Sequence, residues 1–180
     1  MTLANKAETT TTDVHSIHNK AYEQLLVEEL KAIYWAEKHL LKSIPVLMRT
    51  AGDGELHDTL AAHLQQTGTH VARIQKMFEI LGTPAFANKS AAMAGITEQG
   101  NTLLDATTPG TTARDAALVF IMQKIEHYEM ATYAALAQLA TRLGHNSIAE
   151  LCYTTMEEET IMDELLMEIA EKNIYYRHIV

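Results

Sequence analysis

The sequence has little of what a sheet protein needs. Aromatic residues make up only 6% of the 180 residues, and there are only eight glycines and three prolines. The most frequent residues, with Thr, are Ala, Leu and Glu, and these three favour helices, whereas strands are rich in β-branched and aromatic residues. The length is that of one domain with a sizeable core. We therefore expect a single all-α domain.

Positive charge is also scarce, because 14 Lys and Arg face 23 Asp and Glu for a net charge of −9. Binding to nucleic acid or to an anionic membrane surface relies on clustered Lys and Arg, so we expect neither partner. No apolar run approaches the roughly 20 residues that span a bilayer. Cys152 alone cannot form an internal disulfide, and residues 1–18 lack the apolar stretch of a signal peptide. We expect a disordered tail over 1–18 and a cytoplasmic protein.

Four long segments carry apolar residues at spacings of three and four, which predicts helices over about 19–50, 55–81, 112–143 and 147–172. Pro45 should kink the first helix or remove one backbone hydrogen bond. Thr112 and Ser147 are the expected N-caps of the last two helices. Short breaks at 51–54 and 143–146 separate the first helix from the second and the third helix from the fourth. The long connection 83–111 contains a weaker helix at about 91–105.

Two antiparallel helix pairs joined by a long crossover describe the ferritin-like variant of the four-helix bundle. We place the bundle at 19–174, with a C-terminal tail at 175–180.

Acidic side chains interrupt the apolar stripes. Glu37 lies seven residues from both Leu30 and Ile44, and Glu126 and Glu129 share one helix face three residues apart. The remaining candidates lie on the second and fourth helices. They are Gln66 and His70 on the second helix, Glu158 as the best fit to the fourth stripe, and Glu159 with Asp163 at its edge. The fourth stripe consists of Ile148, Leu151, Thr155, Met162 and Leu165.

Carboxylates that face one another in a core repel and raise one another's pKa, and an unpaired buried charge is costly. Because the stripes contain almost no Lys or Arg, divalent cations are the simplest way to neutralise them, and carboxylate with imidazole suits iron or manganese. A single acid on a stripe is more often at a solvated edge, and 157–159 alone would suit a charged surface. We interpret His63 as a surface or core-edge residue. The occurrence of a polar interruption on all four helices favours a metal site.

Several segments resemble a known family, the stress-associated YciF/YciE-type ferritin-like proteins. Residues 34–41 (YWAEKHLL) resemble its YxAEKQLL element, 63–67 (HLQQT) its HLEET, and 124–131 (KIEHYEMA) its KVEHYEIA. The elements DAAL, LGH and EEEKATD have counterparts at 115–118, 143–145 and 157–163. The matches cover about residues 22–172 in the same order.

The resemblance implies a rubrerythrin-like site with two iron ions, manganese being the other candidate, and a homodimer. The matching positions are Glu37, Gln66, His70, Glu126, Glu129, Glu158, Glu159 and Asp163. Two departures stand out. Gln66 replaces an acid, so the second helix lacks a Glu-x-x-His motif, and the fourth helix has no histidine ligand.

Three functions follow as hypotheses. The first is a metal-binding stress protein with oxidase or peroxidase activity, whose electrons come from a separate protein because a rubredoxin-type module needs four cysteines. The second is a non-enzymatic dimeric helical stress protein with a degenerate site, acting through protein–protein contacts. The third, iron storage, would require assembly into a large shell. The catalytic residues stay unassigned in each.

Overall fold

The computed structural model describes residues 5–176, with side chains for residues 19–176. Five α-helices and a final turn of π-helix account for most of this part of the chain. They are α1 (Asn5–Met48), α2 (Gly54–Ile80), α3 (Ala91–Asp105), α4 (Thr112–Leu143), α5 (Asn146–Ile169) and η1 (Ala170–Tyr175). The described residues contain no strand and no helix long and apolar enough to cross a membrane.

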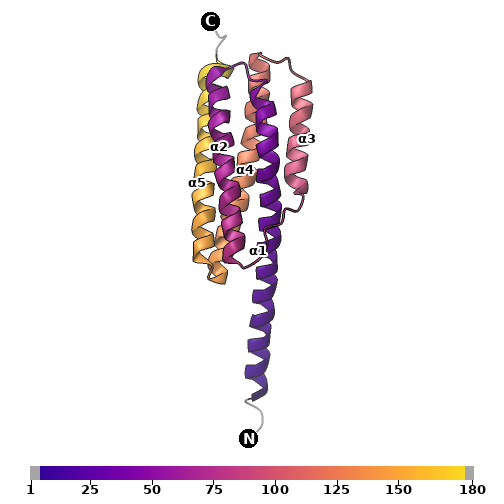
Figure 1. Cartoon of the computed structure of the whole chain (residues 1–180), viewed down its shortest axis with the longest axis vertical. Helices are drawn as coiled ribbons and strands as arrows, with labels where there is room; N and C mark the ends of the chain where they lie inside the picture. The colour runs from indigo at the N-terminus through magenta and orange to yellow at the C-terminus, as the bar shows by residue number, and fades with distance from the viewer. Residues whose placement is uncertain (1–4, 177–180) are drawn as a thin grey trace.

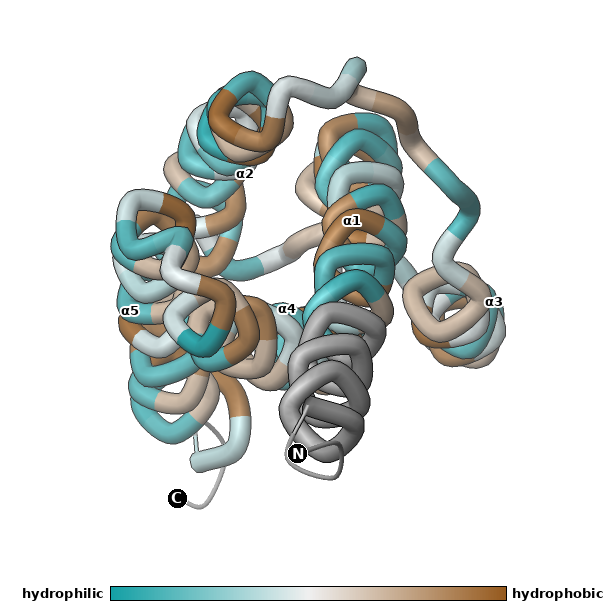
Figure 2. The backbone as a smooth tube through the Cα atoms, turned by 90° about the horizontal axis from the view of Figure 1, so that it is seen from below, coloured by the Kyte–Doolittle hydropathy of each residue, from teal (hydrophilic) through white to brown (hydrophobic). Residues whose placement is uncertain are grey.

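The four long helices form a bundle in which each packs on two neighbours, in the ring order α1, α2, α5, α4. Figure 1 shows α1 and α5 running upward and α2 and α4 downward. The short helix α3 lies outside the ring, packed on α4 and beside α1, as the end-on view of Figure 2 also shows. The two antiparallel pairs with a helical crossover confirm the predicted ferritin-like bundle.

The turns explain where the helices start and stop. Asp53 caps α2 by accepting a hydrogen bond from the amide of Leu56 at 3.0 Å, and Gly144 ends α4 with a φ of 82°. A side chain at Gly52 would place its Cβ 2.8 Å from the backbone of Gly110. The α1–α2 turn therefore packs directly against the α3–α4 loop, which holds the end of the crossover that leads into α4 against the bundle.

Several predicted boundaries need correction. The N-cap of α4 is Thr111 rather than Thr112, because the Oγ1 of Thr111 accepts from the amide of Arg114 at 3.2 Å. Helix α5 begins one residue earlier than predicted, and its cap position is His145 instead of Ser147. Helix α1 begins at Asn5 instead of near Asn19, because no glycine or proline precedes Pro45, and it continues through Pro45 to Met48.

The two predicted tails fall at the limits of the described chain. The first was placed at 1–18, of which residues 1–4 lie outside the described residues. The second was placed at 175–180, where Tyr175 ends the π-helix and residues 177–180 lie outside the described residues.

The core is a continuous apolar cluster along the bundle axis, with Leu26 and Leu30 of α1 and Ile74 and Phe78 of α2 fully or almost fully buried. At mid-height this cluster is interrupted by buried acids and histidines. Apolar layers above and below therefore fix the four helices, and the polar side chains between them are held in a closed interior.

Candidate metal centre

Each of the four bundle helices contributes at least one polar side chain to the interior. The buried positions on α5 recur every three or four residues, and this spacing is that of one helix face. They are Ile148, Ala149, Cys152, Thr155, Glu159, Met162, Asp163, Leu166 and Ile169. Glu159 lies on this face with no exposed surface, whereas Leu165, which we had placed on the stripe, is 43% exposed. The predicted stripe was therefore right at Ile148, Thr155 and Met162, but it is Glu159 rather than Glu158 that enters the core.

Helices α1 and α4 contribute three further carboxylates, those of Glu37, Glu126 and Glu129, all with no exposed surface. Glu126 and Glu129 are one helical turn apart, so their side chains leave α4 on the same face. Helix α2 contributes His63 and His70, two turns apart and both buried. All four helices thus send side chains to one level of the bundle.

These side chains form two groups of converging ligand atoms. In each group, one nitrogen or oxygen per residue lies within 4.8 Å of the others. One group contains His63, Glu126, Glu129 and Glu159, and the other contains Glu37, His70 and Glu159. Glu159 belongs to both groups, so its carboxylate could be shared between two ions if both groups held metal.

Few of these atoms form hydrogen bonds with one another. His63 Nε2 lies 3.4 Å from an oxygen of Glu126, and His70 Nδ1 lies 2.9 Å from Glu159 Oε1 and 3.4 Å from Glu37 Oε1. Despite this proximity, the geometry is not that of hydrogen bonds. The buried atoms without a hydrogen-bond partner include both oxygens of Glu126, Glu129 and Glu159, both nitrogens of His63, and His70 Nδ1.

Such atoms cost free energy in an interior unless something else binds them. Lone pairs that converge without pairing are the arrangement expected around a cation. The donor set therefore fits metal ions.

The pKa values of the clustered side chains also indicate a site that favours positive charge. Burial first, and then neighbouring carboxylates, raise the pKa values of Glu126 and Glu129 well above the usual value. Burial would also raise the pKa of Glu159, but His70 and His63 outweigh it and lower that pKa. Burial would lower the pKa of His70, but Glu159 and Glu37 raise it to about 10. The cluster attracts positive charge, and protons supply it when cations do not.

A second layer of contacts surrounds the cluster. The hydroxyl of Tyr133 donates to Glu37 Oε1 at 2.5 Å. On the α2–α5 side, His70 Nε2 lies 2.9 Å from Glu158 Oε2, and Arg73 binds both oxygens of Glu158. These contacts fix one oxygen of Glu37 and the ring of His70 from outside the centre.

Five of the eight residues that the sequence predicted as ligands belong to the two groups: Glu37, His70, Glu126, Glu129 and Glu159. The other three do not. Glu158 is held by Arg73, and Gln66 is half-buried in the wall of a groove. The Oδ2 of Asp163 lies 3.1 Å from the Nε2 of the surface residue His127. The helix phase explains Glu158 and Gln66, because their side chains leave the helices beside the inward face, whereas Asp163 is buried but pairs with His127.

Sequence reasoning missed two residues at the site. His63, which we interpreted as a surface or core-edge residue, is 2% exposed and belongs to the first group. Its spacing of seven from His70 was the available signal, because residues seven apart share a helix face. Arg73 had no such signal, since its role depends on Glu158 of another helix.

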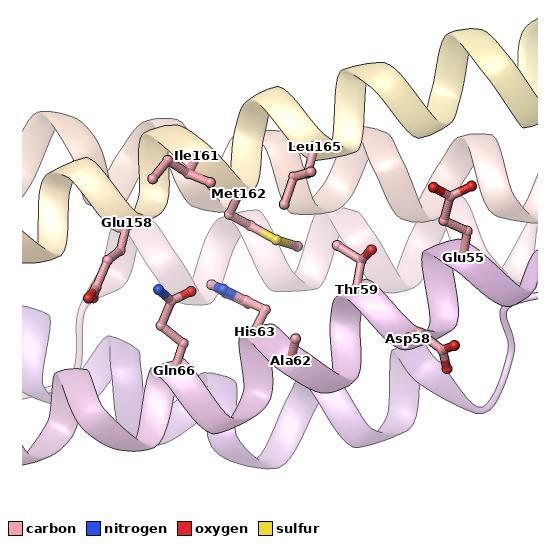
Figure 3. Close-up of a pocket in the computed structure, with 10 residues that line it drawn as sticks. All are labelled: Glu55, Asp58, Thr59, Ala62, His63, Gln66, Glu158, Ile161, Met162 and Leu165. Atoms are coloured by element: carbon pink, nitrogen blue, oxygen red, sulfur yellow. The ribbon is translucent and has the colours of Figure 1, made fainter.

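A groove of about 560 Å³ between α2 and α5 leads to the site. Figure 3 shows His63 and Gln66 extending from α2 toward α5, with Glu158 and Met162 opposite. Because His63 lines this groove and also belongs to the ligand cluster, the groove gives small molecules a path to the first group.

The two groups together hold four glutamates and two histidines. Ferritin-like di-iron and di-manganese proteins use the same total, as one Glu from each of two helices and a Glu-x-x-His motif from each of the other two. Here the distribution differs, because α2 supplies both histidines and no acid. The missing Glu-x-x-His motif therefore does not reduce the number of candidate ligands.

Fold and site thus define a ferritin-like bundle with a buried carboxylate–histidine cluster that could hold metal ions. The chain belongs to the family described as a domain of unknown function, DUF892, whose model matches residues 21–177. It is 35% identical to Protein YciF of Escherichia coli strain K12 over 156 residues, which is 86% of this chain and 93% of that protein.

Solved structures agree with this assignment. The crystal structure of the E. coli stress protein YciF has a TM-score of 0.80 and 34% identity, covering 85% of this chain and 96% of that one. The structure of YcfI from Rhodopseudomonas palustris has a TM-score of 0.79 and 30% identity, covering 81% of this chain and 92% of that one.

Proposed function

We propose that the chain is a cytoplasmic stress-response protein that binds two iron or manganese ions in the bundle core and uses them in oxidase or peroxidase chemistry. The observation that carries the proposal is the convergence of buried ligand atoms that lack hydrogen-bond partners. The stress connection rests on the relative whose structure is described as a stress protein.

Charge balance supports two divalent ions. The groups contain four carboxylates, from Glu37, Glu126, Glu129 and Glu159, and two such ions would neutralise them when all four are ionised. Arg73 does not alter this sum, because its guanidinium is paired with Glu158 outside the groups. The alternative neutralisation by protons leaves most carboxyl oxygens without partners in a closed interior, which is the more costly state.

The protein's own residues have separable roles. Glu159 would be shared between the ions, His63 and His70 would supply one nitrogen to each group, and Tyr133 would hold Glu37. A pair of iron or manganese ions supplies redox chemistry toward oxygen or peroxide. Cys152 is buried, and burial raises the pKa of its thiol to about 12, so it does not serve as a redox partner. Electrons would come from a separate protein.

We also propose that the chain forms a homodimer through the outer face of α1 and α4. A hollow of about 730 Å³ lies there, lined by Tyr22, Leu25 and Leu139 among others. Tyr22 and Leu25 are 38% and 48% exposed there, and exposed apolar side chains that gather in one place are typical of protein–protein contacts. Light scattering coupled to gel filtration should give twice the chain mass, and the monomer mass would contradict the dimer.

The metal proposal is tested by anaerobic titration with ferrous iron, followed by metal analysis and admission of oxygen. We expect about two ions per chain and, after oxygen, an absorption band of oxo-bridged iron. Glu129→Ala should abolish uptake with helix content unchanged. Glu157→Ala is the matched control, because it removes an exposed acid from α5 and should leave uptake intact.

The other hypotheses are outcomes of the same titration. No uptake above background would contradict the proposal and favour the scaffold with a degenerate site. Iron far in excess of two per chain, in a particle of many chains, would favour storage.

A further inference from the structure

Helix α5 places two successive glutamates on the two nitrogens of one imidazole. Glu159 Oε1 lies 2.9 Å from His70 Nδ1, inside the candidate centre. Glu158 Oε2 lies 2.9 Å from His70 Nε2, on the opposite edge of the ring. Glu159 is fully buried, whereas the Glu158 side chain is 26% exposed, so only the first belongs to the interior cluster.

Glu158 is itself held in place. The Nη2 of Arg73 donates to Glu158 Oε1 at 2.7 Å, and its Nη1 donates to Glu158 Oε2. The same Nη1 donates to the Oγ1 of Thr155 at 3.2 Å, which anchors the guanidinium to α5. An arginine that binds both oxygens of a carboxylate fixes its orientation as well as its charge.

The one salt bridge of Arg73 among the described residues is to Glu158, outside the cluster, and the more distant charge of Glu159 acts on Arg73 less strongly. Its contact with the centre is therefore made through Glu158 and His70. Arg73 is three residues after His70 on α2, so the arginine and the histidine leave that helix on neighbouring positions and reach Glu158 together.

We propose that Arg73 and Glu158 are a positioning pair that fixes the imidazole of His70 with Nδ1 directed at the metal centre. This inference rests on the proposed function. Glu158 accepts the hydrogen of Nε2, so the lone pair available for a metal ion is the one on Nδ1. A metal-binding histidine generally donates its other N–H to such a partner, and loss of the partner weakens metal binding by about 10–100-fold.

The affinity of the wild-type protein and four variants for cobalt(II) tests the pair, with a chelator as competitor and the visible cobalt spectrum as a second readout. Glu158→Ala should weaken one of the two ions by about 10–100-fold and change its spectrum. Glu158→Gln should weaken it less, because the amide oxygen still accepts from Nε2. Arg73→Gln should also have a smaller effect, because Glu158 stays in place but loses its anchor.

Glu157→Ala is the matched control, since it removes the same charge from the adjacent residue of α5. Equal losses in Glu158→Ala, Glu158→Gln and Glu157→Ala would overturn the inference, because charge alone would then explain them. Unchanged affinity in Glu158→Ala would also overturn it while leaving the proposed function standing.

A second measurement does not depend on metal. In the ¹⁵N-labelled metal-free protein, the Nε2–H signal of His70 should be protected from exchange with water. The protection should be lost in Glu158→Ala and retained in Glu157→Ala. If wild-type protein binds no metal, the proposed function fails, and persistence of the protected signal in Glu158→Ala would still refute the positioning role.

Discussion

Replacing Glu129 by leucine should stabilise the metal-free protein and remove the stabilisation by metal. Glu129 has no exposed surface, and neither of its oxygens has a hydrogen-bond partner. A buried polar group without a partner costs about 1–3 kcal/mol, and an apolar side chain of similar volume removes that cost. For a chain of this length, each kcal/mol raises the melting temperature by roughly 2–4 °C.

With metal bound, the wild type should instead be more stable than Glu129→Leu. Ligand binding to the folded state alone adds about 2.7 kcal/mol when free metal is 100-fold above its dissociation constant. Glu129→Leu removes a ligand that reaches the first group, so the variant should gain little on addition of manganese. The order of stability should therefore reverse between the two conditions.

Scanning calorimetry of both proteins, with and without manganese, measures the reversal. Glu157→Leu is the control, because Glu157 is exposed on the same bundle and should behave as wild type in both conditions. A lower melting temperature for metal-free Glu129→Leu would refute the reasoning, because it would show that the carboxyl group is well satisfied without metal. A full metal-induced gain in that variant would refute the ligand assignment.

Three other predictions concern pH, the thiol and packing. The metal-free protein should lose stability as pH rises above the ordinary carboxyl pKa of 4.5. The reason is that the raised pKa values of Glu126 and Glu129 make the folded state keep protons that the unfolded chain releases. Thermal melts across pH should show this slope, and saturating metal should abolish it. Cys152 should resist a thiol reagent in the native protein and react fully in denaturant, and rapid native labelling would contradict its burial. Gly52→Ala should destabilise the protein by about 1–3 kcal/mol in urea melts, because the new methyl would meet the backbone of Gly110, and an unchanged midpoint would show that this contact is loose.

The helices were predictable because their signals are local. Apolar spacing and turn residues located α3 and α4 at the predicted residues, and the crossover indicated the bundle type. Three of the ligand positions followed from acids lying in the middle of apolar stripes, as for Glu37, Glu126 and Glu129. These positions needed no knowledge of the partner helices.

The remaining errors depend on helix phase and on contacts between helices. Three successive acids at 157–159 leave α5 in three directions, and a sequence pattern that mixed Leu151 and Leu165 into the stripe selected the wrong one. His63 and Arg73 gain their roles only from residues more than 60 positions away in sequence, Glu126 and Glu158 respectively. Such pairings are set by packing, and no local rule reveals them.

Anomalous diffraction from crystals grown anaerobically with ferrous iron would locate bound metal directly. We predict two peaks at the iron edge, one among His63, Glu126, Glu129 and Glu159, and the other among Glu37, His70 and Glu159. Crystals soaked in iron that show no peak among these side chains, with the carboxyl groups paired to one another through protons, would contradict the account.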